Sequence, residues 1–129
     1  MTFELLTLPL LALLCLALPF VYGPARARQV GGKALLGNRE NLPPPDGVAG
    51  RGLRAHQNLI ENLVPYAIVV LAAHAAGVSN TVTAIAAGVF LAARLVHAAC
   101  YVAGITLARS VAYFAGVAAT LVILVQLFF

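Results

Sequence analysis

The chain has 129 residues, of which 62% are hydrophobic and only 9% are charged, with a formal net charge of +4. Soluble domains carry about 25% charged residues, so this composition excludes an ordinary soluble domain and indicates an integral membrane protein. The length fits a single domain, residues 1–129, and leaves no room for a separate soluble domain beside a helical bundle.

Four segments are apolar over most of the roughly 20 residues that a helix needs to cross a bilayer. We expect helices over about residues 2–22, 50–76, 82–103 and 108–129. The short turns "GVSN" at 77–80 and "GITLA" at 104–108 favour antiparallel neighbours. The predicted fold class is therefore all-α, an integral membrane four-helix bundle with antiparallel up-down topology.

An alternative reading makes the first 27 residues a cleaved signal peptide, because "ARA" at 25–27 resembles a cleavage site. A signal peptide starts with a positively charged region, whereas the only early charge here is Glu4. We therefore favour a first membrane helix.

Residues 23–49 are expected to form a loop, because "GG" at 31–32 and "LPPPDG" at 42–47 disfavour a continuous helix. Lys and Arg are enriched in cytoplasmic loops, and here they lie in this loop and at the helix ends on its side of the membrane. We expect that side to be cytoplasmic, at the inner membrane if the source is bacterial, and both termini to lie outside. The basic residues on this side are Arg26, Arg28, Lys33, Arg39, Arg51, Arg54 and Arg109, and the eighth, Arg94, lies inside a predicted helix. Arg28, Lys33 and Arg39 are most simply anchors near anionic lipid.

Two other classes of partner are disfavoured. The basic residues lie beside membrane segments without interleaved aromatic residues, so we expect no nucleic acid. Cys15 and Cys100 lie in apolar segments and form no CxxC or Cys/His pattern, so we expect neither a disulfide framework nor a metal site.

Two polar stripes interrupt the apolar helices. Arg51, Arg54, Asn58 and Glu61 follow a spacing of three, four and three, and Arg94, His97 and Tyr101 follow a spacing of three and four, so each set lies on one helix face. A lone charge inside a membrane is unfavourable by about 3 kcal/mol or more, so we expect Arg94 to pair with Glu61 at a similar depth.

The alternative is that these residues only join helices. For His56 a binding role and a place at the membrane interface are equally open, and His74 is expected to be structural.

The stripes suit a small anionic or zwitterionic ligand, since arginine side chains bind carboxylates as forks and a glutamate binds an amine. Glutathione has these groups and a thiol, whose reactive form is the thiolate. A cation in the first turn of a helix favours a thiolate through charge and helix dipole together. Arg109, followed by Ser110, occupies such a place.

The motifs "RGLRAHQNLIENLVPY" (51–66), "ARLVHAACY" (93–101) and "ARSVAY" (108–113) resemble the membrane-associated proteins in eicosanoid and glutathione metabolism, the MAPEG family. The resemblance is closest to the branch of microsomal prostaglandin E synthase and microsomal glutathione transferase. It implies a homotrimer that binds glutathione between neighbouring subunits near the cytoplasmic face.

The resemblance also implies roles for single residues. It places glutathione contacts at Arg54, Asn58, Glu61, His97, Tyr101 and Arg109, with Arg26 as a further candidate. Arg109 resembles the thiolate stabiliser, Ser110 an assisting catalytic serine, and Arg94 the buried arginine of the third helix, which we count with the glutathione site. Gln57 stands where the synthase branch has a basic residue, which removes one carboxylate partner and predicts weaker affinity.

The expected function is a glutathione-dependent membrane transferase that activates the thiol as a thiolate for attack on a lipophilic electrophile or peroxide, or for an isomerisation. One alternative is a non-catalytic lipid-binding or scaffold member of the same family. The other is a small four-helix exporter, which would need a membrane carboxylate in its first helix, whereas Glu4 lies at the extreme end of the chain.

Overall fold

The computed structural model describes residues 1–129 and is all-helical. Its helices are α1 (Phe3–Val30), α2 (Gly32–Leu36), α3 (Gly47–Ala75), α4 (Thr81–Ala103) and α5 (Thr106–Gln126). The four long helices α1, α3, α4 and α5 are long and apolar enough to cross a membrane, whereas α2 is a single short turn of helix in the connection between α1 and α3. The predicted four-helix membrane fold is confirmed.

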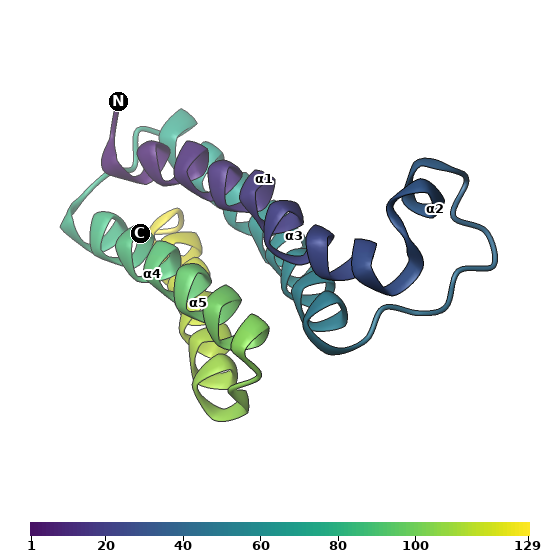
Figure 1. Cartoon of the computed structure of the whole chain (residues 1–129). Helices are drawn as coiled ribbons and strands as arrows, with labels where there is room; N and C mark the ends of the chain where they lie inside the picture. Colours follow the sequence, from purple (N-terminus) through teal and green to yellow (C-terminus); the bar gives the residue numbers. More distant parts are fainter.

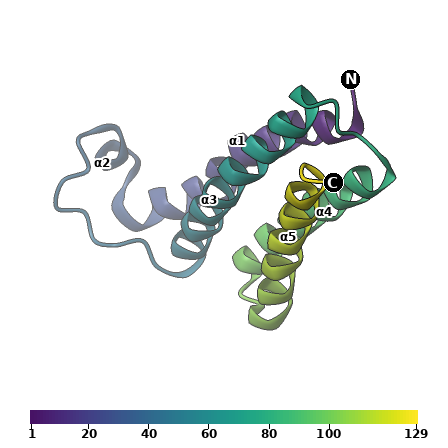
Figure 2. The ribbon, with the colours of Figure 1, turned by 180° about the vertical axis from the view of Figure 1, so that it is seen from behind.

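The long helices are arranged as two antiparallel pairs, α1 with α3 and α4 with α5 (Figure 1). The two termini lie at one end of the bundle, and α2 with the connection to α3 lies at the other, as the reverse view in Figure 2 also shows. The turn between α4 and α5 is at the same end as α2. The structure therefore has the up-down topology that the short turns predict.

The first helix is longer than expected, and the predicted loop 23–49 is correspondingly wrong over its first third. α1 continues through Gly23 and Pro24 to Val30, and ends where Gly31 adopts a φ of 83°. A proline inside a helix removes one backbone hydrogen bond, which membrane helices tolerate. The Ala, Arg and Gln residues that follow Pro24 are good helix formers, so the helix stops only at a glycine with positive φ.

The start of α3 is held against the end of α1. Gln29 Nε2 donates to the backbone oxygen of Asp46 at 3.1 Å and also to Asp46 Oδ1. Arg26 Nη2 donates to the backbone oxygen of Pro43. These bonds bring the proline-rich connection back to the bundle and explain why α3 begins at Gly47, three residues before the predicted start.

The core of the bundle joins all four long helices. Leu11 of α1, Leu59 of α3, Phe90 of α4 and Ile123 of α5 are each at most 2% exposed. Tyr66 of α3 stacks on Phe90 with 3.7 Å between the ring centroids. The outward faces are equally apolar and remain exposed, which is the pattern of helices whose solvent is lipid. The chain is an integral, multi-pass membrane protein.

A polar network closes the end of the bundle that carries the termini. Glu4 is only 5% exposed, and its carboxylate accepts hydrogen bonds from Ser79 Oγ at 3.2 Å and from Thr83 Oγ1. Asn80 caps α4 and donates through Nδ2 to Gln126 Oε1 at 3.0 Å. Glu4 therefore joins α1 to the start of α4, a buried position that its place near the chain terminus did not suggest.

Candidate functional site

A polar cavity of about 220 Å³ is lined by residues of α3, of the last turns of α4 and of the first half of α5. Five of the residues that the sequence singles out line it together with two aromatic residues. The lining residues are Asn58, His97, Tyr101, Arg109, Ser110, Tyr113 and Phe114.

The turn between α4 and α5 determines how this cavity is built. α4 ends at Gly104, which caps the helix with a φ of 82°, and α5 begins two residues later at Thr106. A left-handed cap of this kind is easiest for glycine, which has no Cβ. The sharp turn brings Arg109 Cζ to 4.5 Å from the ring centroid of Tyr101, and so places a cation at the mouth of the cavity within the first turn of α5.

Helical spacing aligns the aromatic wall. His97 and Tyr101 are four residues apart on α4, and their rings meet edge to face with 5.4 Å between centroids. Tyr113 approaches His97 from α5, at 6.3 Å between centroids. His97 lines the cavity although it is only 4% exposed.

Arg94 lies behind this wall instead of within it. It is 1% exposed, and its Nη2 donates to the backbone oxygens of Ala112 at 3.2 Å and Tyr113 at 3.1 Å. Its Nη1 makes a long contact of 3.4 Å to Asn58 Oδ1. Arg94 thus connects α4 to α3 and α5, which matches the alternative that it joins helices.

The predicted pairing of Arg94 with Glu61 is wrong. Glu61 is on the exposed side of α3, whereas the Arg94 guanidinium turns to Asn58 and to carbonyl oxygens of α5. Gly116 leaves the space for this, since a Cβ there would overlap the guanidinium, 2.9 Å from Cζ and closer still to Nη2. Arg94 Nε has no hydrogen-bond partner.

Besides Arg94, three predicted ligand residues lie outside the cavity. Arg54 and Glu61 are exposed on α3. Arg26, on the last turns of α1, lines a different cavity of about 290 Å³ together with Arg39 and the proline-rich connection. One chain therefore gathers Asn58, His97, Tyr101, Arg109 and Ser110 around the cavity. It does not bring Arg26, Arg54, Glu61 or Arg94 to the lining.

Sequence reasoning overlooked Tyr113 and Phe114, which line the cavity, and a contact of Arg51 outside it. Tyr113 lies four residues after Arg109, the spacing that places both on one face of α5, so periodicity was a usable signal. Arg51 was counted only as part of the polar stripe, but its Nε donates to the backbone oxygen of Val102 at 2.9 Å and so joins the start of α3 to the end of α4. Nothing in the local sequence indicates that contact.

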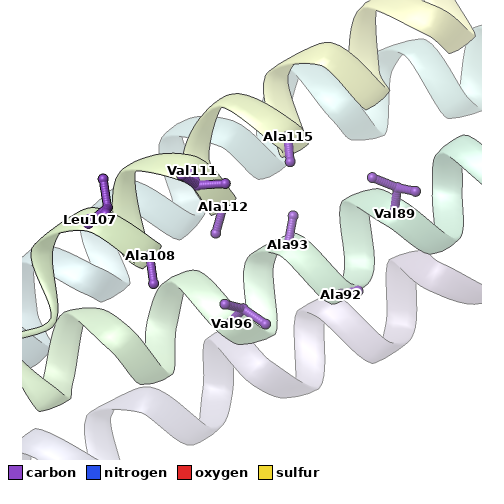
Figure 3. Close-up of a pocket in the computed structure, with 9 residues that line it drawn as sticks. All are labelled: Val89, Ala92, Ala93, Val96, Leu107, Ala108, Val111, Ala112 and Ala115. Carbon is purple, nitrogen blue, oxygen red and sulfur yellow. The ribbon is translucent and has the colours of Figure 1, made fainter.

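An apolar groove of about 550 Å³ runs along the same two helices between different residues. In Figure 3, the side chains that α4 and α5 contribute to the lining of this groove consist only of carbon atoms. Its lining residues are Val89, Ala92, Ala93, Val96, Leu107, Ala108, Val111, Ala112 and Ala115. The groove is open because many of its lining side chains are small alanines, and its apolar lining suits a lipid chain or a lipophilic molecule.

These features define a class, an integral membrane protein of four long helices with a polar, arginine-containing cavity at one end of the bundle. The profile of the MAPEG family matches residues 5–129, nearly the whole chain, and the chain belongs to this family. The family includes glutathione transferases and related enzymes as well as non-catalytic members. Neither a curated protein nor a solved structure gives a significant match. The family resemblance is confirmed, while the closer resemblance to one branch stays a prediction.

Proposed function

We propose that this protein is a glutathione-dependent membrane transferase, which activates the glutathione thiol as a thiolate for attack on a lipophilic electrophile or peroxide. The observation that carries the proposal is the position of Arg109, in the first turn of α5 and beside a cavity lined by further hydrogen-bonding groups. Membership of a family that includes glutathione transferases supports it.

The residues that line the cavity fit glutathione chemically. Arg109 supplies a guanidinium, Asn58 an amide, Tyr101 a hydroxyl and His97 an imidazole, all groups that bind carboxylates and peptide groups. The cavity of about 220 Å³ is smaller than the roughly 300 to 1,000 Å³ of pockets for small-molecule ligands. One chain thus offers part of a site, in line with a ligand shared between subunits.

We therefore propose a homotrimer in which a neighbouring copy completes the site. Arg54 and Glu61 are exposed on α3, and Arg26 lies near the end of α1 on the same side of the bundle. In an assembly Arg54 and Glu61 are free to meet a glutathione molecule held by the cavity of the next subunit, whereas Arg26 would have to exchange its hydrogen bonds to Gln29 and Pro43 for the ligand. The positive-inside pattern supports a cytoplasmic location of this end of the bundle.

Arg109 is proposed to hold the thiolate. Its charge and the first-turn amide groups of α5 both favour the deprotonated sulfur over the thiol. Ser110 lines the cavity, and its Oγ donates to the backbone oxygen of Thr106 at 3.0 Å, so the oxygen is available to accept a hydrogen bond and a rotated hydroxyl to donate one to the ligand. The thiolate forms a bond to the electrophilic carbon, the leaving group departs with the bonding electrons, and the thiol proton passes to water.

The second substrate is proposed to arrive from the bilayer. The outward faces of the long helices are apolar, and the groove between α4 and α5 accepts an apolar chain alongside the helix that carries Arg109.

The experiment is a calorimetric titration of glutathione into the detergent-purified protein, with the ultraviolet thiolate band recorded on the same sample at neutral pH. Binding with a thiolate band is expected. Binding without the band would indicate a ligand-holding relative, and no binding would favour the scaffold alternative.

Three variants and one control locate the site. We expect Arg54→Ala and Glu61→Ala each to raise the Kd for glutathione about tenfold, the effect of losing one charge-assisted contact. Arg109→Ala is expected chiefly to abolish the thiolate band. Arg28→Ala is the matched control, because it removes an exposed arginine at the same end of the bundle outside the proposed site. Unchanged binding in both Arg54→Ala and Glu61→Ala would contradict the assignment of the pocket.

A further inference from the structure

A second cluster of reactive groups lies between α1 and α3, away from the polar cavity. Cys15 Sγ is 3.2 Å from His56 Nε2, and Tyr22 Oη is 3.1 Å from His56 Nδ1. Both ring nitrogens of His56 are thus engaged, one by a thiol and the other by a phenol. A nucleophile next to a base that a third group orients is the arrangement that activates cysteine and serine side chains in enzymes.

Close packing of the two helices holds the cluster in place. Gly52 of α3 lies directly against Tyr22 of α1, and a Cβ at this glycine would overlap Tyr22 Cβ and come within 3.1 Å of its Cγ. Tyr22 therefore sits on the surface of α3, one turn from His56, with its hydroxyl on the imidazole. The position of the imidazole against Cys15 is set by this hydrogen bond and by the contact of the helices.

The cluster also accommodates the charged state that activation produces. When the thiol proton moves to His56 Nε2, the ring carries a proton on each nitrogen. The sulfur accepts one of these and Tyr22 Oη accepts the other, since a phenol oxygen is both donor and acceptor. Neither proton of the imidazolium is left without a partner.

Cys100 provides an internal comparison. Both cysteines are free and half-buried in membrane helices, but Cys100 has no histidine in hydrogen-bond contact. Cys15 lies near the middle of α1, next to Leu16, which is 69% exposed, and two residues from Leu13, which is 64% exposed. These leucines face the lipid, so lipophilic molecules reach the neighbourhood of Cys15 more readily than charged ones.

We propose that Cys15, with His56 as its base and Tyr22 as the residue that positions the base, is a site of covalent modification by lipophilic α,β-unsaturated carbonyl compounds. The sulfur forms a bond to the β-carbon while its proton moves to His56 Nε2, and the electrons of the carbon–carbon double bond move to the enolate. His56 then returns the proton to the α-carbon. The adduct contains all atoms of both reactants, and no oxidant or reductant is needed.

The test compares the alkylation of the two cysteines in one molecule, without glutathione. The full chain in lipid nanodiscs is treated with N-dodecylmaleimide, a lipophilic member of this class, and adducts at Cys15 and Cys100 are followed by peptide mass spectrometry. General base catalysis predicts that Cys15 reacts at least tenfold faster than Cys100. A sulfonated, membrane-impermeant maleimide is expected to leave Cys15 unmodified over the same time.

Two variants separate activation from simple access. His56→Gln keeps a hydrogen-bonding side chain but cannot take the proton, and should lower the rate at Cys15 to about that at Cys100. Tyr22→Phe removes one hydroxyl and should lower the Cys15 rate several-fold. The rate at Cys100 should not change in either variant, and so reports that the bundle is intact.

Equal rates at the two cysteines of the native chain would overturn the proposal. So would a Cys15 rate that survives both substitutions, or a faster reaction with the sulfonated reagent. Because glutathione is absent, these outcomes are independent of whether the protein is a glutathione transferase.

Discussion

The close contact between Gly116 and Arg94 predicts that Gly116→Ala lowers the free energy of unfolding. A methyl group at this position would overlap the guanidinium of Arg94, 2.9 Å from Cζ and 3.0 Å from Nε. Moving the guanidinium costs hydrogen bonds, because Arg94 is 1% exposed and its Nη2 is bonded to the carbonyl oxygens of Ala112 and Tyr113. Gly116→Ala should therefore displace Arg94 and weaken both bonds.

The magnitude follows from the groups involved. A hydrogen bond to a charged group contributes about 1.5 to 3 kcal/mol, so weakening two of them loses about 3 kcal/mol. Replacing glycine by alanine inside a helix stabilises the folded state by about 1 kcal/mol. We expect a net loss of about 2 kcal/mol in the free energy of unfolding, which lowers Tm by roughly 5 to 10 °C for a chain of this size.

The assay is thermal unfolding in detergent followed by circular dichroism, with Gly88→Ala as the matched control. Gly88 also lies inside a membrane helix, but a Cβ there would meet only the Phe3 ring at 3.6 Å, an ordinary contact. Gly88→Ala should therefore be neutral or slightly stabilising. In an Arg94→Met background, Gly116→Ala should no longer destabilise. Equal shifts for the two glycine variants would refute the role assigned to Arg94.

Three further outcomes are expected. Arg109→Lys keeps the charge but loses the planar fork, so glutathione binding should change only a few-fold while kcat for conjugation falls at least tenfold; unchanged steady-state kinetics would show that any cation suffices. Thr83→Val removes a donor to the buried Glu4 carboxylate and should lower the free energy of unfolding by about 1 to 3 kcal/mol in thermal melts. Thr120→Val, which loses only a bond within its own helix, is its control. Glutathione at 100 times its Kd should stabilise the protein by about 2.7 kcal/mol, and a Tm independent of glutathione concentration would contradict binding to the folded state.

The polar cavity and the Cys15 cluster share no residue, although each includes a residue of α3, and this matters for interpreting activity. The cavity is built mainly from α4 and α5, whereas Cys15 and His56 lie on α1 and α3. A lipophilic electrophile that alkylates Cys15 would consume no residue of the cavity. If such a compound inactivates the protein and Cys15→Ser prevents this, the loss of activity comes from a changed packing of α1 against α3 and not from a blocked cavity.

The membrane helices could be predicted from the sequence because their cause is local. In lipid every backbone polar group must be satisfied within its own helix, so length and apolar composition are sufficient to identify the four long helices. Periodicity also identified which residues share a helix face, but only the resemblance to the MAPEG family placed Asn58, His97, Tyr101 and Arg109 in one site.

The end of the first helix was not predictable in the same way. "YGPARARQV" contains a glycine and a proline that favour a break, followed by residues that favour a helix. The outcome depended on contacts made far along the chain, since Gln29 reaches Asp46 and Arg26 reaches Pro43 only if α1 continues to Val30.

Sequence alone determined the membrane class, the four long helices and the faces that carry polar residues, because each depends on neighbours within a turn or two. Tertiary structure alone decided the partners of the buried groups. Arg94 turns to α5 and not to Glu61 because Gly116 leaves room there, and His56 meets Cys15 and Tyr22 because Gly52 lets α1 approach α3. Such contacts depend on how each helix is rotated about its own axis, which small residues in other helices control.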